Sequence, residues 1–261
     1  MTARQRDASG LAPIRIRVAS YNVLYGQMGT PEQIGEMFRP YDLDVIGFCE
    51  APAGDWTARV GEVLGMGHAY VGNVSSANHK DKYKSILSRT PLANQREHVL
   101  AGRGWNPASA VSAETVIGPL RIAFYSLHIC ANHPDADGKI PGRGQAQDLA
   151  ERVLPAEKAP LIIAVGDYNE HVDSDSLRRL EAAGMRATWL DLNTDLSRAA
   201  TWPSAPREHD IDPLAVGVID HILYSVAGGA RAVDGGIIEL DPPLSDHKPI
   251  WADLRVQPQQ D

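Results

Sequence analysis

The chain has 261 residues, a hydrophobic fraction of 43%, a charged fraction of 22% and a formal charge of −8. This length suits one large sandwich or α/β domain that builds its core without disulfides, and two cysteines exclude a disulfide framework. Cys49 and Cys130 each lie in an apolar run, which predicts buried, reduced thiols. The acidic balance argues against strong non-specific binding to nucleic acid, although it does not exclude a nucleic-acid substrate.

The two ends of the chain predict tails on a single domain. Residues 1–13 contain basic side chains but no apolar stretch behind them, so we expect a flexible arm and no signal peptide. No apolar run reaches the roughly 18 residues that a membrane span needs. We therefore expect one cytoplasmic domain over residues 14–255 and a short C-terminal tail at 256–261.

The first half of the chain alternates strand and helix patterns. Apolar and polar residues alternate at 14–20, which predicts a strand with one solvated face. Thr30 followed by Pro31 predicts the start of a helix. The apolar run 44–50 predicts a strand buried on both faces. Further predicted elements are a helix at 55–64 and strands at 68–72, 85–88, 97–100, 109–116 and 120–127.

The second half continues with a helical pattern at 144–154 and an apolar strand at 161–165. A helix is expected at 174–183, where Gly184 would end it. Late strands are predicted at 218–224, 236–240 and 249–254. In total the patterns give about ten strands and four helices without strict βαβ alternation, which favours an α/β fold of two packed sheets over a Rossmann fold or a barrel.

Polar residues end many of the apolar strands. A carboxylate at a buried strand end is costly unless it is paired, hydrogen-bonded or bound to a cation. One such residue would be read as a cap or turn, but several at comparable positions predict a shared site at one sheet edge. Oxygen-rich groups of this kind suit Mg²⁺ or Mn²⁺ better than zinc. The residues are Asn22, Glu50, His128, Asp167, Asn169, Asp220, Asp246 and His247.

The same positions carry a family resemblance. In chain order the motifs are Ser-Tyr-Asn at 20–22, Phe-Cys-Glu at 48–50, Ile-Leu-Ser-Arg-Thr-Pro at 86–91, Ser-Leu-His at 126–128, Arg-Gly-Gln-Ala-Gln at 143–147, Gly-Asp-Tyr-Asn at 166–169, Ile-Asp-His at 219–221 and Ser-Asp-His-Lys-Pro at 245–249. Together they resemble the endonuclease/exonuclease/phosphatase superfamily, with a DNase I-like fold, over roughly residues 15–254. The resemblance implies a four-layer α/β sandwich, with two mainly antiparallel sheets flanked by helices, that cleaves phosphate esters with a divalent ion.

The resemblance also implies roles for the residues nearest the metal and the water. Glu50, with Asn22 close by, would bind Mg²⁺, and Asp246 would complete the acidic metal environment. Asp167 would orient or deprotonate the attacking water, and Asn169 would donate to the developing pentacovalent phosphorus centre. For Asn22, a simple turn role is the alternative.

Three further roles concern histidines. His247 would act as a base or phosphate contact while Asp220 fixes its tautomer. His128 would contact the phosphate or act as a general acid, unless it is an inert strand-end residue. His221 points to the other face of its strand from Asp220 and is interpreted as structural.

Departures from the family pattern bear on the substrate. Cys49 replaces a frequent glutamine, and Leu24 replaces an aspartate typical of members that repair abasic DNA. Those members also use a tyrosine where this chain has the His128 motif. This last difference makes the chain more similar to the DNase-like and phosphatase-like branches, and together the departures bear on the substrate class more than on activity.

Candidate substrate contacts lie outside the core motifs. Lysines crowd into residues 79–84, which is either a solvated loop or a phosphate-gripping segment that includes Lys84, and Arg89 follows in the next motif. Trp105 and Trp202 either line a pocket or anchor the core.

The sequence leads to a ranked set of functions. The first is a Mg²⁺- or Mn²⁺-dependent hydrolase in which metal-activated water attacks a small or lipid-linked phosphate mono- or diester. The alternative is a DNA or RNA nuclease with the same site, so that nucleic acid enters only as a substrate. A non-catalytic binding module and a site recruited to another reaction rank lower. The oligomeric state is left open.

Overall fold

A computed structural model describes residues 13–101, 105–131, 137–204 and 211–257. The expected arm and tail therefore lie almost wholly outside the described residues. None of the helices within the described ranges is long and apolar enough to cross a membrane. Cys49 and Cys130 are buried and form no disulfide, as expected.

The first sheet has six strands that come from both ends of the chain. Its strands are β1 (Ile14–Asn22), β2 (Val45–Ala51), β3 (His68–Val71), β4 (Tyr83–Ser88), β11 (Ala230–Ile237) and β12 (Ile250–Val256). The order across the sheet is β11-β12-β1-β2-β4-β3. β1 pairs antiparallel with β12 and parallel with β2, so the ends of β1 and β2 reach the same sheet edge.

The second sheet has six strands from the middle of the chain. They are β5 (Ala93–Val99), β6 (Ser109–Ile117), β7 (Leu120–His128), β8 (Leu161–Asp167), β9 (Met185–Ala187) and β10 (Asp220–Ser225). Their order is β5-β6-β7-β8-β10-β9, with the parallel pair β7–β8 at the centre. Only two of the ten described strand pairings are parallel, so both sheets are mainly antiparallel, as predicted.

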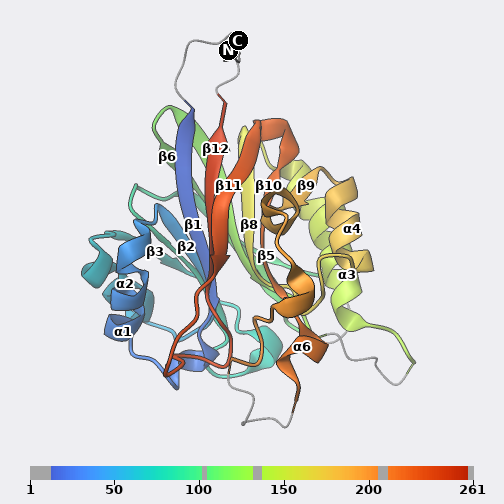
Figure 1. The fold of residues 1–261 in the computed structure, drawn as a ribbon. Coiled ribbons are helices and arrows are strands. Elements are labelled where there is room, and N and C mark those ends of the chain that lie inside the picture. The colour runs from blue at the N-terminus through green and yellow to red at the C-terminus, as the bar shows by residue number, and fades with distance from the viewer. Residues whose placement is uncertain (1–12, 102–104, 132–136, 205–210, 258–261) are drawn as a thin grey trace, which may run out of the picture.

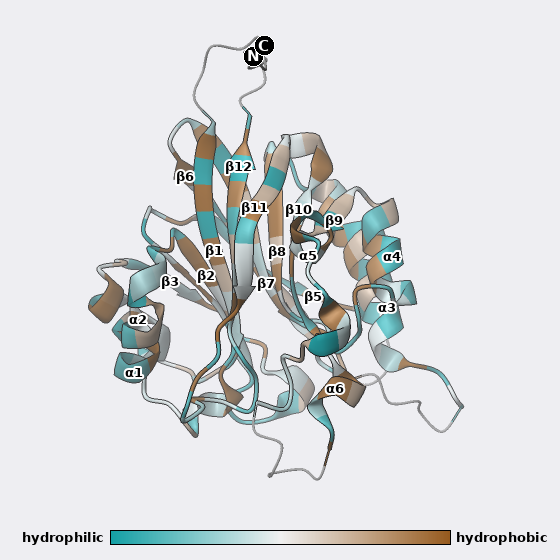
Figure 2. Cartoon of the chain, in the orientation of Figure 1, coloured by the Kyte–Doolittle hydropathy of each residue, from teal (hydrophilic) through white to brown (hydrophobic). Residues whose placement is uncertain are grey.

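The two sheets pack face to face around the main hydrophobic core. Ile16 and Val45 from the first sheet and Phe124 and Val165 from the second are fully buried in it. The sheets approach so closely at Gly47 that an added Cβ would lie 2.3 Å from a methyl carbon of Val165, which explains the glycine inside β2. The apolar colour of the strand interiors in Figure 2 follows this core.

Helices cover both outer faces of the sandwich. α1 (Pro31–Phe38) and α2 (Trp56–Leu64) lie against the first sheet, and α3 (Pro141–Asp148) and α4 (Asp175–Ala182) against the second (Figure 1). α1 begins where predicted because Thr30 and Gln33 form a capping box. The predicted four-layer α/β sandwich is therefore confirmed.

Some elements differ from the sequence predictions. The strand expected at 236–240 is β11, which ends at Ile237 and pairs with β12. Its sequence contains an aspartate and two glycines, which lower strand propensity, so pairing with β12 decides its structure. Three short elements were not predicted: β9, α5 (Thr188–Leu192) and α6 (Pro213–Val216). Such short segments carry too few residues to show a period.

Candidate active site

Strand polarity brings the predicted polar residues together. Asn22 and Glu50 lie at the ends of the parallel strands β1 and β2, and His128 and Asp167 end the parallel strands β7 and β8. Asp220 begins the antiparallel neighbour β10 and is paired in register with Asp167. Because the two sheets face each other, these side chains converge at one end of the sandwich.

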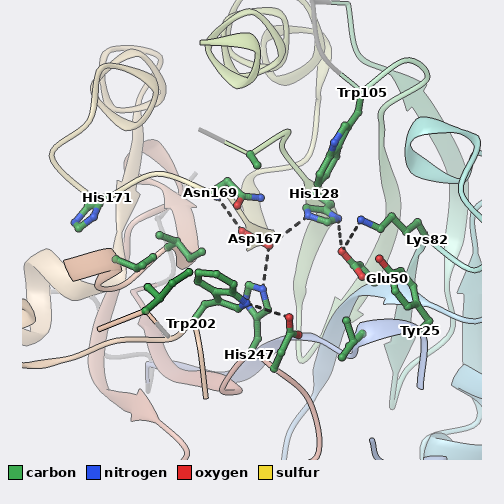
Figure 3. A pocket seen from close by; sticks show the side chains of 16 residues that line it. Tyr25, Glu50, Lys82, Trp105, His128, Asp167, Asn169, His171, Trp202 and His247 are labelled. Carbon is green, nitrogen blue, oxygen red and sulfur yellow. Dashed lines mark hydrogen bonds and ion pairs between the residues drawn. The ribbon is translucent and has the colours of Figure 1, made fainter. Parts of the chain in front are cut away.

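Glu50, His128 and Asp167 line a pocket of about 520 Å³ (Figure 3). Asn22 and Asp220 do not line it, but they contact Asp167 and His247, which do. Apolar side chains make much of its wall, including Trp105, Trp202, Ile211, Val216 and Ile219. The charged and polar residues that line it are Glu50, Lys82, His128, Asp167, Asn169, His171, Asp246 and His247. A small polar centre inside apolar walls is the usual composition of a small-molecule site.

Asp167 is the centre of the polar floor. Its Oδ2 atom lies 3.3 Å from His128 Nε2 and 3.5 Å from His247 Nε2, and it accepts a hydrogen bond of 3.2 Å from Asn22 Nδ2. The backbone N–H of Asn169 donates to Oδ1 at 2.9 Å. Burial opposes the charged carboxylate, but His247 and His128 outweigh it and lower the pKa of Asp167 to about 2.

His247 is held between two carboxylates. Its Nδ1 lies 2.9 Å from Asp220 Oδ2, on the side of the ring away from Asp167. Burial disfavours the charged ring, yet Asp220 and Asp167 raise the pKa of His247 to about 10. The two carboxylates therefore favour the charged form of the ring, and Asp220 fixes its orientation.

Glu50 makes a different kind of contact. Its Oε1 lies 3.1 Å from Lys82 Nζ and 3.8 Å from His128 Nδ1, while its buried Oε2 has no hydrogen-bond partner. The Lys82 ammonium lies 4.6 Å from the ring centre of Trp105 and 5.4 Å from that of Tyr25. The backbone of Glu50 is left-handed, with φ of 52°, which is a sparsely populated conformation for a residue other than glycine. It occurs at the end of β2, where the Glu50 side chain lines the pocket.

Asp246 and Asn169 have partners of their own. Asp246 accepts hydrogen bonds from Trp202 Nε1 at 3.0 Å and from Ser245 Oγ at 3.3 Å. Asn169 also has a left-handed backbone, with φ of 52°, and its Nδ2 donates to the carbonyl of Ile129 at 2.9 Å. That hydrogen bond fixes the orientation of its amide beside Asp167.

Two predicted substrate contacts lie away from the pocket. The Lys84 Nζ is buried and donates to Val74 O at 2.9 Å and to Ser76 Oγ at 3.2 Å, where it supports a loop. Arg89 follows the far end of β4, because β4 runs antiparallel to β2, and it donates to Leu43 O. Neither residue lines the pocket, so both assignments are corrected.

The pocket also contains residues that the sequence did not single out. Lys82 belongs to the lysine run 79–84, so the pattern indicated the right segment but the wrong member. Tyr25 follows the first motif in a left-handed turn with φ of 58°, and no local pattern marks it. His171, which lies in a polar loop outside the motifs, lines the exposed rim. His221 is structural as expected: it is buried, and its Nε2 contacts the carbonyl of Glu170 at 2.8 Å.

The sequence model of the Endonuclease/Exonuclease/phosphatase family matches residues 19–247. This chain belongs to that family. Family members are hydrolases that act on phosphoester bonds and typically depend on a divalent metal. A comparison with curated protein sequences finds no match.

Solved structures of the family share the fold. An endonuclease/exonuclease/phosphatase from Beutenbergia cavernae has a TM-score of 0.73 at 18% identity, over 93% of this chain and 72% of that one. The mannosyl-6-phosphatase Bt3783 of Bacteroides thetaiotaomicron has a TM-score of 0.65 at 18% identity, over 92% of this chain and 99% of that one. TDP2 of D. rerio, complexed with a single-strand DNA product, has a TM-score of 0.70 at 14% identity, over 92% of this chain and 98% of that one.

This member of the family has a donor set suited to a divalent cation. The buried Oε2 of Glu50 has no hydrogen-bond partner, and Asp246 presents a second carboxylate to the same pocket. Hard oxygen ligands of this kind suit Mg²⁺ or Mn²⁺. Asp167, Asp220 and His247 also lie close enough together to hold an ion. The atoms of that group already contact one another, whereas Glu50 has a free buried oxygen, so Glu50 is the better anchor.

Proposed function

We propose that this chain is a divalent-metal-dependent phosphoester hydrolase that uses water to cleave a phosphate mono- or diester of a small or lipid-linked substrate. The observation that carries the proposal is the placement of Asp167 between His128 and His247 on the floor of the pocket. Carboxylates and histidines in one network can orient a water and stabilise charge on a phosphate.

We assign distinct roles to the residues of this network. Asp167 accepts a hydrogen bond from the attacking water and aligns it, because its low pKa keeps it ionised. His247 donates from its charged ring to a phosphoryl oxygen, while Asp220 keeps the ring oriented. His128 and Asn169 complete the polar floor next to Asp167 and contact the phosphate.

Glu50, Asp246 and Asn22 are the residues that would hold Mg²⁺ or Mn²⁺. A bound divalent cation supplies positive charge that neutralises a phosphoryl oxygen and stabilises the leaving oxygen. Of these three, Asn22 already donates to Asp167 and accepts from the N–H of Leu24 at 3.2 Å. Asn22 would therefore connect the residues that hold the cation to Asp167, which aligns the water.

The pocket supports a small substrate over a long nucleic acid. Its volume lies within the range of about 300–1,000 Å³ found for small-ligand sites. Lys82 is the single lysine or arginine among the described residues that line it, whereas binding a long polyanion depends on several phosphate contacts. The rings of Trp105 and Trp202 suit an apolar or planar group attached to the phosphate.

A nuclease is the second candidate, and the two tryptophans favour it as well. Aromatic side chains beside a phosphate site can stack on a single unpaired base. The nuclease would then act on a chain end or a single strand, which places one nucleotide in the pocket. We also propose a cytoplasmic location, supported by the two free thiols.

A panel of phosphoesters tests the proposal. Plasmid, oligonucleotides, nucleotides, inositol phosphates, sugar phosphates and a lipid phosphodiester are incubated with the protein in Mg²⁺ or Mn²⁺, with and without EDTA. We expect metal-dependent release of product from one small or lipid-linked class and its loss in His247→Gln. Cleavage confined to oligonucleotides would select the nuclease, and no cleavage in any class would contradict the proposal.

A further inference from the structure

Lys82 forms a largely buried ion pair with Glu50, the carboxylate proposed to bind the metal. Its Nζ lies 3.1 Å from Glu50 Oε1, and the two side chains are only 14% and 8% exposed. The ring faces of Trp105 and Tyr25 lie within cation–π range of the same ammonium. Figure 3 shows Lys82 reaching across the pocket wall toward Glu50. The lysine is therefore a part of the site, although no motif of the chain contains it.

The two carboxylate oxygens of Glu50 have different surroundings. Oε1 faces the ammonium, whereas Oε2 is buried without a hydrogen-bond partner. A buried carboxylate needs a counter-ion, and Lys82 supplies one from the chain itself. A divalent cation that binds Glu50 has to share the carboxylate with this ammonium or displace it, because two positive charges on one carboxylate repel each other.

We propose that Lys82 is a built-in competitor that weakens and thereby sets the divalent-cation affinity of the Glu50 site. The inference depends on the proposed role of Glu50 as the metal-binding carboxylate. When the ammonium leaves Glu50, the faces of Trp105 and Tyr25 continue to stabilise its charge within the pocket wall. Lys82 thus keeps Glu50 neutralised when no metal is bound and limits loading to cations that bind strongly enough to displace it.

Mn²⁺ binding to purified protein tests this inference without any activity measurement. Isothermal titration calorimetry at fixed pH and ionic strength compares the wild type with Lys82→Met, which keeps the length of the side chain and removes its charge. Lys80→Met is the matched control, because Lys80 is exposed in the same segment. We expect Lys82→Met to lower the dissociation constant about tenfold or more, since one charged contact no longer has to be broken. Lys80→Met stays within twofold of the wild type.

Two more variants make the result specific. Lys82→Arg keeps the charge and should stay within about threefold of the wild type, whereas Glu50→Gln should weaken Mn²⁺ binding at this site about 10–100-fold. Thermal unfolding with and without Mn²⁺ confirms that each variant folds, and the shift in melting temperature on adding Mn²⁺ should be larger for Lys82→Met than for the wild type. If Lys82→Met is not folded, Lys82→Gln replaces it.

The outcomes separate this inference from the proposed function. If the uncharged variants bind Mn²⁺ no more tightly than a wild type that does bind it, the role of Lys82 is wrong and the metal site stands. If Glu50→Gln binds Mn²⁺ as tightly as the wild type, or if the wild type and Lys82→Met both bind none, the metal role of Glu50 is contradicted and the inference falls with it.

Discussion

The two sides of the pocket floor satisfy their charges in different ways. On one side, Asp220, His247 and Asp167 form a line of buried groups in which the imidazolium lies between two carboxylates. On the other side, Glu50 shares one oxygen with Lys82 and leaves the second without a partner. Asp167 connects the sides through His128, which contacts both carboxylates.

This difference indicates what each side contributes. The first side is pre-organised by the chain's own groups, so it can orient water and phosphate without a change in charge. The second side has a surplus acceptor and a displaceable lysine, which suits an exchangeable cation. Substitutions on the two sides should therefore change different measured quantities.

The largest effect is expected from His247→Gln. Removing the oriented imidazolium should lower kcat on the active phosphoester by a factor of about 10²–10⁴, the range typical of a positioned proton donor or acceptor. The half-saturating Mg²⁺ concentration should change little. His98→Gln is the control, because His98 lies in β5 and contacts Ser112 at 2.9 Å outside the pocket. Equal activity of the wild type and His247→Gln in steady-state assays would contradict the role.

Glu50→Gln should affect the metal instead. We expect the half-saturating Mg²⁺ concentration for hydrolysis to rise about 10–100-fold, because a neutral amide is a weaker ligand than a carboxylate. At saturating Mg²⁺ much of the activity should return. Glu62→Gln, on the exposed face of α2, should match the wild type. A Mg²⁺ titration in which Glu50→Gln and His247→Gln behave alike would remove the distinction between the two sides.

A pH-dependent effect on stability is expected at His221, which lies next to Asp220 but on the other face of β10. Burial lowers the pKa of His221 to about 4, whereas an unfolded histidine has a pKa of about 6.5. Between these values the unfolded state binds more protons, so stability falls as the pH falls. The wild type should lose up to about 3 kcal/mol more than His221→Asn between pH 7 and pH 4.

Urea unfolding at both pH values measures this difference. His68→Asn, in β3, should follow the wild type and serves as the control. A loss of stability in His221→Asn as large as in the wild type would show that other groups titrate instead. His221 would then not be the buried histidine whose protonation destabilises the fold.

The smallest effect is expected from Trp202→Phe. The ring is kept, but the hydrogen bond of 3.0 Å to Asp246 is lost, so kcat/KM should fall about fivefold, equivalent to roughly 1 kcal/mol. Trp251→Phe, in β12 against Tyr41, is the control outside the pocket. A decrease in kcat/KM of more than a hundredfold would mean that Asp246 depends on Trp202 for its position.

Much of this structure could be predicted from local pattern. The apolar run of β2, the capping box at Thr30 and the strand that ends at Asp167 each follow from a few neighbouring residues. The extent of β11 could not be predicted, because its glycines disfavour a strand and β12 supplies its hydrogen bonds. Within the candidate site, the polar strand ends named from the sequence lie close together, whereas Lys84 and Arg89, the second of them inside a motif, were assigned to a pocket that neither one lines.

The length, composition and charge of the chain by themselves determined that it can form a large core without disulfides, and that its acidic balance disfavours strong non-specific binding to a long polyanion. The order of its polar strand ends added the family and a set of candidate residues. Only the tertiary structure decided that Lys82, and not Lys84, faces Glu50, and that Trp105 and Trp202 face the pocket. The reason is that motifs record distances along the chain, whereas the charge balance of a site depends on groups that distant strands and loops bring together.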